Sequence, residues 1–450
     1  MITNLTEGPI RKTLWLYSIP MLVSVMFQQI YNIADSMIAG KFAGEDALAA
    51  VGASYPITML FIAIAVGSNV GSSVVISQLF GAKDYTTMKT AVSTCLCSII
   101  GLSVFLTLIG FIFCNPLMTL IHTPENIFDD AALYMRIYIA GILFLFLYNI
   151  CTGIFNALGD SKTPLYLLIM SSVGNIILDY IFVVYCKWAV AGVAWATFIA
   201  QGFSCIVAFI ILMGRLSKFH PEIKAPHFSF EMLKKISYMS IPSILQQSFV
   251  SVGNIFIQSL INSFGSAVIA GYSAAMKLNT FAVTSYSTLG NGLSGFTAQN
   301  VGAAKPDRIK SGYFCGCQLA WLITVPFLAA FFIFPKQLLL LFMNAQSSQA
   351  LNTGIEFLKI LSPFYFFVGT KLISDGALRG SGAMKTFMIA TFTDLILRVV
   401  LSYILAVPFG ITGVWLSWPI GWLAATALSV GFYINLYYPD LFKKRLKKKN

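Results

Sequence analysis

The sequence predicts an all-α polytopic membrane protein in which twelve transmembrane helices form two six-helix lobes, and three observations lead to this fold class. The 450 residues are 57% hydrophobic and only 10% charged, and their mean hydropathy is +0.79. Ordinary soluble domains carry far more charge. Apolar runs recur along the chain, and they are long enough to cross a bilayer, which takes about 20 residues. Short motifs of the first half also return in the second half.

The apolar runs follow one another with short polar loops between them. They predict helices at about residues 10–38, 47–72, 87–113, 130–155, 164–185, 189–213, 236–262, 267–297, 311–333, 352–376, 384–406 and 411–436. Several contain Gly or Pro, which membrane helices tolerate because neighbouring helices satisfy the freed backbone groups. Pro20 and Pro242 are expected to bend the first and seventh helices.

An internal repeat divides the chain into two halves. Ser18-Ile19-Pro20 returns as Ser240-Ile241-Pro242, Gln78–Ala82 as Gln299–Ala303, Gly159–Thr163 as Gly382–Thr386, and Gly192-Val193 as Gly413-Val414. The repeat predicts an N-lobe at 1–214, a charged cytoplasmic linker at 215–235, a C-lobe at 236–436 and a basic cytoplasmic tail at 437–450. Because each half has an even number of helices, the repeat is parallel, which is typical of transporters.

The distribution of charge predicts the orientation and argues against nucleic-acid binding. The net charge of +12 comes from residues dispersed over alternate loops and the C-terminal tail. The positive-inside rule then places both termini in the cytoplasm, with the basic tail beside anionic lipid. The first span is expected to be its own insertion signal, because residues 1–9 do not resemble a cleaved signal peptide.

A polar stripe within the first predicted helix organises the functional prediction. Gln28, Tyr31, Asn32 and Asp35 recur at i, i+3, i+4 and i+7, which places them on one helix face. An Asp at the centre of a bilayer costs about 2.5–3.5 kcal/mol on insertion scales and usually marks an ion or substrate path. The alternative is that Asp35 only joins neighbouring helices, through Asn32 or a backbone group.

Together these motifs resemble the MATE (multidrug and toxic compound extrusion) family, most closely its bacterial DinF-type branch. The resemblance is carried by Asp35 within Tyr31–Gly40, the two turns Gln78–Ala82 and Gln299–Ala303, Leu158–Pro164 and Leu378-Arg379-Gly380, and it covers essentially the whole chain. It implies a twelve-helix antiporter that exports organic, often cationic, drugs or toxic compounds by alternating access. Inward movement of H⁺ or Na⁺ would drive export, and no other cofactor is expected.

The resemblance also implies a coupling-ion site in the N-lobe, at Asp35, Asn175, Asp179 and Thr197, with Na⁺ as the candidate metal. The physical reading agrees, because Asn175 and Asp179 are four residues apart and share a helix face. Two carboxylates in a site of low dielectric constant cannot both ionise cheaply. A proton, Na⁺ or a cationic substrate would each relieve the repulsion, and competition for that relief would couple the fluxes. Alternatively, Asp179 is a helix-end acid satisfied by the loop near Lys187.

Further polar residues are predicted to line the substrate cavity, although each could instead form an interhelical hydrogen bond. They are Gln28, Tyr31, Asn32, Asn149, Thr152, Asn156, Gln247 and Asn254. Gln247, Ser251, Asn254 and Gln258 form a polar stripe on the seventh predicted helix, and this stripe has no acid. Relatives of the NorM type carry an acid on that helix as part of a C-lobe ion site, so the resemblance does not imply such a site here. Asp394 and Arg398 are i, i+4 and are predicted to form a structural ion pair. No partner is evident for Lys277 or Lys371.

Other functional classes fit the sequence less well. A flippase of lipid-linked oligosaccharide or another lipid is the alternative, although the predicted N-lobe helices hold no buried Lys or Arg. An enzyme is not expected, because His122, His220 and His227 lie in loops and no Walker motif or nucleophile elbow is present. The eight cysteines lie in or beside apolar runs and are expected to pack rather than chelate metal. We expect a monomer that contacts membrane lipid and small organic substrates.

Overall fold

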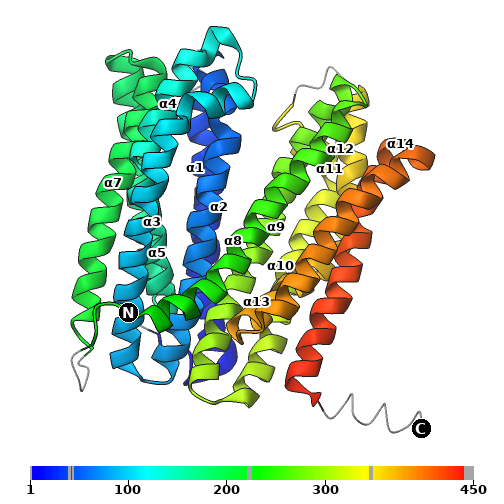
Figure 1. Cartoon of the computed structure of the whole chain (residues 1–450). Coiled ribbons are helices and arrows are strands. Elements are labelled where there is room, and N and C mark those ends of the chain that lie inside the picture. The colour runs from blue at the N-terminus through cyan, green and yellow to red at the C-terminus, as the bar shows by residue number, and fades with distance from the viewer. Residues whose placement is uncertain (1–2, 39–41, 43–44, 220–224, 344–347, 440–450) are drawn as a thin grey trace, which may run out of the picture. The chain divides into compact units, whose positions relative to one another are not determined.

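The computed structural model describes residues 3–38, 42, 45–219, 225–343 and 348–439. The side chains of residues 33–38 and 45–48 are outside this description, although their backbone is helical. Every regular element in the described part of the chain is helical (Figure 1). In order they are α1 Ile10–Ile38, α2 Glu45–Gly81, α3 Tyr85–Leu120, η2 Glu125–Ile127, α4 Phe128–Ala140, α5 Ile142–Ala157, α6 Lys162–Asp179, η3 Tyr180–Tyr185, α7 Ala189–Leu216, α8 Phe230–Asn262, α9 Ser266–Gly302, α10 Pro306–Ile333, α11 Pro335–Leu339, α12 Ser348–Leu361, η4 Ser362–Phe364, α13 Tyr365–Gly380 and α14 Met384–Tyr437.

Breaks within the helices explain how this list corresponds to the twelve predicted spans. The fourth span is broken at Gly141, where the η2–α4 segment and α5 meet at 47°. The tenth span is α12, η4 and α13 in succession, with Pro363 in the short η4 turn. The eleventh and twelfth spans are continuous as α14 except at Gly410, whose φ of 58° is left-handed and lies outside the helical region. The predicted twelve-helix class is therefore confirmed.

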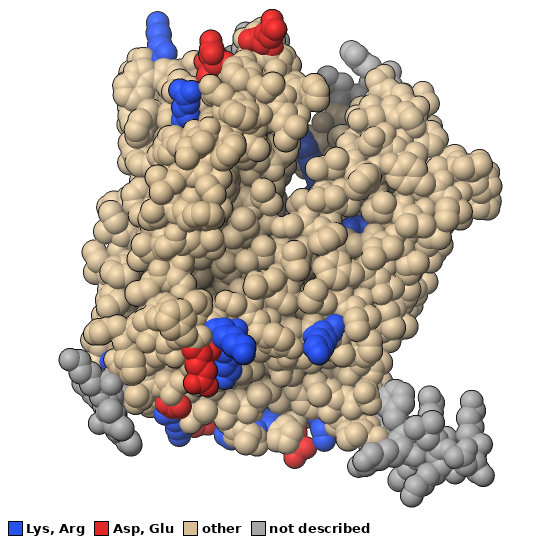
Figure 2. Space-filling model, viewed as in Figure 1, with Lys and Arg blue, Asp and Glu red and all other residues tan. Residues whose placement is uncertain are grey.

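Hydropathy alone accounts for most of these spans. Within the described residues, nine helices are long and apolar enough to cross a membrane, and the bent pair at Gly141 makes ten. That number counts α14 once and omits α9, which carries buried polar residues such as Thr297, Gln299 and Asn300. Most charged side chains visible in Figure 2 lie near the helix ends of each unit, as expected for a protein that spans a bilayer.

The described chain forms two compact units. Unit 1 comprises residues 1–4 and 23–247, and unit 2 comprises residues 5–22 and 248–450. The sequence prediction placed the whole of 1–214 in one lobe, whereas the division into units falls inside α1 and α8. The difference arises because packing, rather than connectivity, defines a compact unit. Tyr17 of α1 is fully buried, for example, and its ring lies beside Gly295 of α9, in unit 2.

Each unit is built around a central helix at an equivalent position of the repeat. In unit 1 this helix is α5, whose Phe146, Ile150 and Ile154 are completely buried and which packs against α2, α3 and α7. In unit 2 it is α13, which packs against α9, α10 and α14. The α9 and α13 backbones touch, since a Cβ on Gly376 would meet the carbonyl of Gly290. Small residues allow this close approach between membrane helices.

Candidate functional site

The first part of the candidate site joins α1 to α6. The Tyr31 hydroxyl lies 2.5 Å from the side-chain oxygen position of Asn175. Tyr31 is half-buried, whereas Gln28 and Asn32 of the same predicted stripe are exposed. Asp35 follows Tyr31 by one turn of α1, but its side chain lies outside the described residues. The structure therefore places three of the four predicted coupling-ion residues, namely Asn175, Asp179 and Thr197.

These three residues are brought together in the last turn of α6 and the facing turn of α7. Asn175 is 3% exposed and Asp179 is 1% exposed. With one orientation of the Asn175 amide, its nitrogen donates to Thr197 Oγ1 at 3.5 Å. With the other, the nitrogen donates to Asp179 Oδ2 at 2.9 Å and the oxygen accepts from the Thr197 N–H at 3.2 Å. We adopt the second orientation because it matches donors to acceptors throughout.

Together, Tyr31, Asn175, Asp179 and Thr197 form what we call the unit 1 polar cluster. It offers one carboxylate and one amide, which are buried, and two hydroxyl groups on half-buried residues. Oxygen ligands of this kind suit a hard cation such as Na⁺, and the carboxylate can equally take a proton. The described residues of the chain contain no group of three or more His, Cys, Asp or Glu that could hold a metal ion. Among the described side chains of the cluster, the donor set is one acid with neutral oxygens.

A change of helix type adjoins the carboxylate. The α-helix α6 ends at Asp179, and the next six residues form the π-helix η3. The Cys186 N–H donates to the carbonyl of Ile181 at 3.0 Å, which is the i→i−5 bond of a π-helix. Such turns are frequent at functional sites because they displace side chains from the α-helical register. Asp179 thus lies inside the apolar span Lys162–Tyr185, at the junction of its α-helical and π-helical parts.

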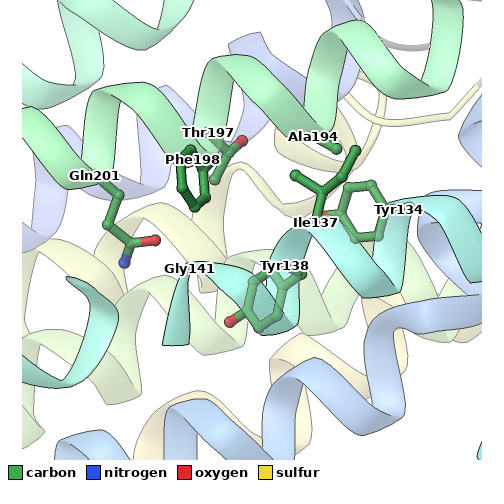
Figure 3. A pocket seen from close by; sticks show the side chains of 8 residues that line it. All are labelled: Tyr134, Ile137, Tyr138, Gly141, Ala194, Thr197, Phe198 and Gln201. Atoms are coloured by element: carbon green, nitrogen blue, oxygen red, sulfur yellow. The ribbon is translucent and has the colours of Figure 1, made fainter. Parts of the chain in front are cut away.

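A small cavity lies beside Thr197 (Figure 3). Its volume is about 10 Å³, and it is lined by Tyr134, Ile137, Tyr138, Gly141, Ala194, Thr197, Phe198 and Gln201. This is about the room that one water molecule requires. Gln201, Tyr138 and Thr197 provide polar groups on its walls. The cavity can therefore hold a water or a small ion next to the unit 1 polar cluster, but no organic substrate.

Two of the other predicted cavity residues, Asn149 and Thr152, form local or interhelical hydrogen bonds. Asn149 donates to the carbonyl of Leu145 at 2.8 Å, and Thr152 donates to the carbonyl of Asn149 at 2.8 Å. Thr152 also lies 3.5 Å from the amide of Asn69 on α2. Asn156, Gln247 and Asn254 are half-buried. A role for these residues in lining a substrate cavity stays a prediction.

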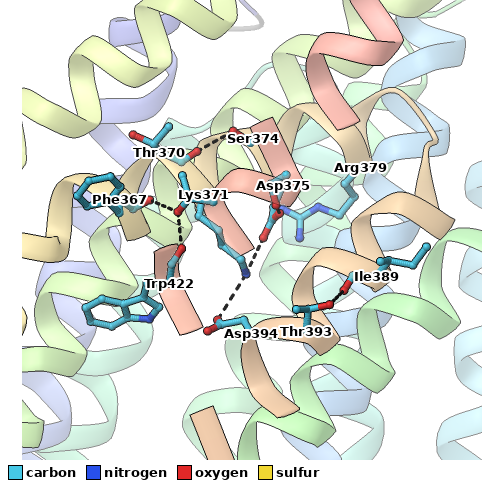
Figure 4. Close-up of polar contacts among 12 residues, drawn as sticks. Phe367, Thr370, Lys371, Ser374, Asp375, Arg379, Ile389, Thr393, Asp394 and Trp422 are labelled. Atoms are coloured by element: carbon cyan, nitrogen blue, oxygen red, sulfur yellow. Dashed lines mark hydrogen bonds and ion pairs between the residues drawn. The ribbon is translucent and has the colours of Figure 1, made fainter. Parts of the chain in front are cut away.

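Unit 2 contains a buried network of charged residues (Figure 4). Lys371 of α13 is 3% exposed, and its Nζ lies 2.7 Å from Asp375 Oδ2 and 3.9 Å from Asp394 Oδ2. Ser429 donates to Asp375 Oδ1 at 2.6 Å. These four residues form what we call the unit 2 ion network, which joins α13 to both halves of α14. Arg379, one turn beyond Asp375, instead donates to Asn291 of α9 at 2.6 Å.

This network corrects the predicted ion pair between Asp394 and Arg398. Among the described residues no ion pair joins them, and Asp394 faces Lys371. The Arg398 guanidinium lies over the Trp418 ring, 4.4 Å from its centroid. The reason is that Lys371 reaches Asp394 from a neighbouring helix, whereas a planar guanidinium stacks favourably on an aromatic face. Lys277, the other lysine without an evident partner, is exposed and lies 5.5 Å from the Phe342 ring centroid.

Asp375 is the functional candidate that the sequence reasoning missed. It is four residues after Lys371, and this i, i+4 spacing of a cation and an acid was a usable signal. Ser429 and Asn291 gave no comparable signal, because they lie far along the chain from the residues they contact.

Comparison with known proteins identifies the family. A protein-family model described as MatE matches the chain twice, at residues 20–181 and 242–404. The chain belongs to the MatE family. The two matches begin at Pro20 and Pro242, which are the repeated positions of the Ser-Ile-Pro motif. The resemblance to the MATE family and the internal repeat are therefore confirmed.

Individual MATE relatives and structures agree with this assignment. The probable multidrug resistance protein YoeA of Bacillus subtilis is 30% identical over 448 residues, covering 96% of each chain. An FAD transporter of Shewanella oneidensis is 24% identical over 315 residues, which is 68% of this chain and 69% of that protein. A MOP superfamily transporter from Pyrococcus furiosus shares the fold with a TM-score of 0.90, at 24% identity over 97% of this chain and 98% of that chain. This MATE chain is therefore a multi-pass membrane protein of a family of transporters rather than of enzymes.

Proposed function

We propose that this MATE protein is a cation-coupled antiporter that exports organic compounds by alternating access, driven by inward movement of H⁺ or Na⁺. The observation that carries the proposal is the unit 1 polar cluster, in which the buried Asp179 accepts from Asn175 beside Thr197. A buried carboxylate in a membrane span is costly unless it is neutralised. A bound transported cation neutralises the carboxylate. When the cation leaves, the buried carboxylate is again charged and energetically unfavourable.

Asp35 completes the proposed coupling site. It lies on α1 one turn beyond Tyr31, which already contacts Asn175. With Asp35 and Asp179 as the two acids, Asn175 and Thr197 serve as neutral ligands. Binding of a cation would then reduce repulsion between carboxylates, and a cationic substrate would compete for the same relief. Such competition is a free-energy coupling between the two ligands.

The proposed location is a bacterial cytoplasmic membrane, with both termini in the cytoplasm and the protein acting as a monomer. Support for the orientation comes from the Lys and Arg residues of alternate loops and the basic tail. The substrate is proposed to be a small organic molecule. The relatives indicate that this class is broad, since one is named a multidrug resistance protein and another an FAD transporter.

A flippase of lipid-linked substrates is the second candidate, and one observation favours it. Unit 2 buries three cations, Lys371, Arg379 and Arg398, and buried cations suit a substrate that carries phosphate. The Pyrococcus furiosus transporter, whose fold is similar, is described as having a binding pocket of reverse polarity that suggests a different function. Fold alone therefore does not decide between the two candidates.

The test is uptake of a fluorescent cationic dye into inverted membrane vesicles, the direction that corresponds to export from the cell, under an imposed pH gradient and separately under an imposed Na⁺ gradient. Wild type is compared with Asp35→Asn, Asp179→Asn and the control Asp130→Asn, which removes an exposed acid of the same unit. Export that follows one gradient and is lost in both site variants but not in the control supports the antiporter and names its ion. Absence of dye movement under either gradient, with folded wild-type protein in the membrane, contradicts it and favours the flippase.

A further inference from the structure

The internal repeat assigns counterparts in unit 2 to Asn175, Asp179 and Thr197 of the unit 1 polar cluster, and to Asp35. The motif pair Gly159–Thr163 and Gly382–Thr386 places Arg398 at the position of Asn175, and Ser402 at the position of Asp179. The pair Gly192-Val193 and Gly413-Val414 places Trp418 at the position of Thr197. The Ser-Ile-Pro pair places Ile257 at the position of Asp35. The counterpart therefore holds no acid and has one fixed cation.

The contact between the two helices is also repeated in space. Asn175 contacts Thr197 in unit 1, and Arg398 lies 4.4 Å from the ring centroid of Trp418 in unit 2. The Ser402 hydroxyl lies 2.8 Å from that of Ser417 and 2.6 Å from the Arg398 carbonyl oxygen, so its hydrogen-bond partners are groups other than the guanidinium. Trp418 supports one face of the guanidinium. The N–H donors lie in the plane of the guanidinium, so stacking on Trp418 does not use them and they can bind another group.

The charge of Arg398 is not balanced by the protein around it. The residue is 6% exposed, and its Nε is buried without a hydrogen-bond partner among the described residues. The nearby acids Asp375 and Asp394 are shared by Lys371. With Arg379 included, this part of unit 2 buries three cations and two carboxylates. A buried cation without a partner is strongly unfavourable unless a ligand supplies the missing anion.

We propose that Arg398, supported by Trp418, is an anion-binding subsite that holds the carboxylate or phosphate of an organic substrate. A guanidinium binds such oxyanions through two parallel N–H···O bonds, which no lysine can reproduce. The inference deepens the proposed function and rests on it: the exported compounds include organic anions and zwitterions, besides cations. Unit 1 thus binds the coupling cation, and the equivalent position of unit 2 binds the anionic group of the substrate.

The test uses two dyes that differ only in the charge of one group. Rhodamine 6G carries an ethyl ester, and its hydrolysed free acid carries a carboxylate on the same ring system. Binding of each is measured by fluorescence polarisation, with the full-length protein in nanodiscs of neutral lipid. We expect Arg398→Gln to weaken binding of the acid about tenfold or more, the size expected for lost charged hydrogen bonds. Binding of the ester should change less than about twofold.

Two further variants control this comparison. Arg398→Lys keeps the charge without the planar fork, so it should retain part of the affinity for the acid. It also replaces Arg398→Gln if that variant does not fold. Lys359→Gln removes an exposed cation from α12 of the same unit and should change neither dye. If phosphatidylglycerol in the nanodisc weakens binding of the acid to wild type but not to Arg398→Gln, a lipid phosphate occupies the same oxyanion subsite.

Equal loss of both dyes in Arg398→Gln, or no loss of either, overturns the subsite and makes Arg398 a structural residue. Measuring dye export by the wild type in vesicles distinguishes failure of the subsite from failure of the proposed antiporter function. If wild type exports the ester but shows no Arg398-dependent binding of the acid, only the subsite is wrong. If wild type exports neither dye under either gradient, the antiporter proposal fails and the subsite fails with it.

Discussion

The Lys371 ammonium lies 2.7 Å from the Asp375 carboxylate, and both side chains are buried. The Asp394 carboxylate lies 3.9 Å from the same nitrogen, so one ammonium group forms ion pairs with two carboxylates. Lys371 and Asp375 are neighbours on α13, whereas Asp394 belongs to α14. The lysine therefore neutralises charge within its own helix and also links two helices of unit 2. No other lysine of the described chain is buried to this extent.

Lys371→Met should strongly destabilise the protein. The substitution keeps most of the side-chain volume but leaves two buried carboxylates without their cation. Breaking a buried ion pair by removing one partner costs about 3–5 kcal/mol. The melting temperature in detergent micelles measures the loss. The control Lys277→Met removes an exposed lysine of the same unit and should melt close to wild type. Equal melting of both variants would show that Lys371 does not hold the network together.

Tyr31→Phe should weaken ion coupling without abolishing export. The hydroxyl lies 2.5 Å from the Asn175 side chain, so its loss removes one hydrogen bond that orients the amide of the unit 1 polar cluster. A hydrogen bond of this kind contributes about 0.5–1.5 kcal/mol. We therefore expect the coupling-ion concentration for half-maximal dye export to rise about two- to tenfold. Tyr166→Phe, at an exposed position of α6, is the control. An unchanged ion dependence in Tyr31→Phe would exclude this role for the hydroxyl.

Hydrogen bonds from Arg308 of α10 hold the segment that precedes α1. Its guanidinium donates to the carbonyls of Gly8 at 2.8 Å, Glu7 at 3.0 Å and Leu5 at 3.2 Å. Gln299, in one of the repeated turns, accepts from the Leu5 N–H at 3.1 Å. The repeated motif Gln299–Ala303 thus has a structural use in unit 2, where it forms part of the binding surface for residues 5–8.

Arg308→Ala should release this segment while leaving the helices intact. Hydrogen bonds to charged groups contribute about 1.5–3 kcal/mol, so exchange of the Leu5 amide hydrogen should become about tenfold faster or more. Hydrogen–deuterium exchange measured by mass spectrometry reports this directly. Lys310→Ala is the control, because its ion pair with the fully exposed Asp307 contributes little. Exchange at Leu5 that is equally slow in both variants would show that Gln299 and Asn300 suffice.

The helices could be predicted from the sequence because apolar length is a local property. The polar helix α9 was also recovered, as the predicted span 267–297, although its hydropathy alone does not identify it. The bend at Gly141 and the π-helix after Asp179 were not predicted. Both depend on how neighbouring helices pack, and an apolar run does not record that packing.

Prediction of the site followed the same division between local and distant contacts. Asn175 and Asp179 are one turn apart, so their common helix face was visible in the sequence, and Thr197 was added only through the family resemblance. Asp394 was assigned to Arg398 because that was its nearest opposite charge along the chain. Its partner Lys371 lies on another helix, and only the tertiary structure shows that contact. Local spacing thus identifies the members of a polar site better than their partners.

Gly71→Ala should destabilise unit 1, although alanine normally favours a helix over glycine by about 1 kcal/mol. Gly67 and Gly71 are i, i+4 on α2, and a Cβ on either would collide with backbone of α8, at Ile244 and Ser240 respectively. Overpacking of this kind typically costs about 1–3 kcal/mol. Gly52→Ala is the matched control, because a Cβ there meets nothing within 4 Å. We expect the melting temperature to fall in Gly71→Ala and to stay level or rise in Gly52→Ala. A fall of equal size in both would mean that loss of glycine itself, rather than contact with α8, sets the cost.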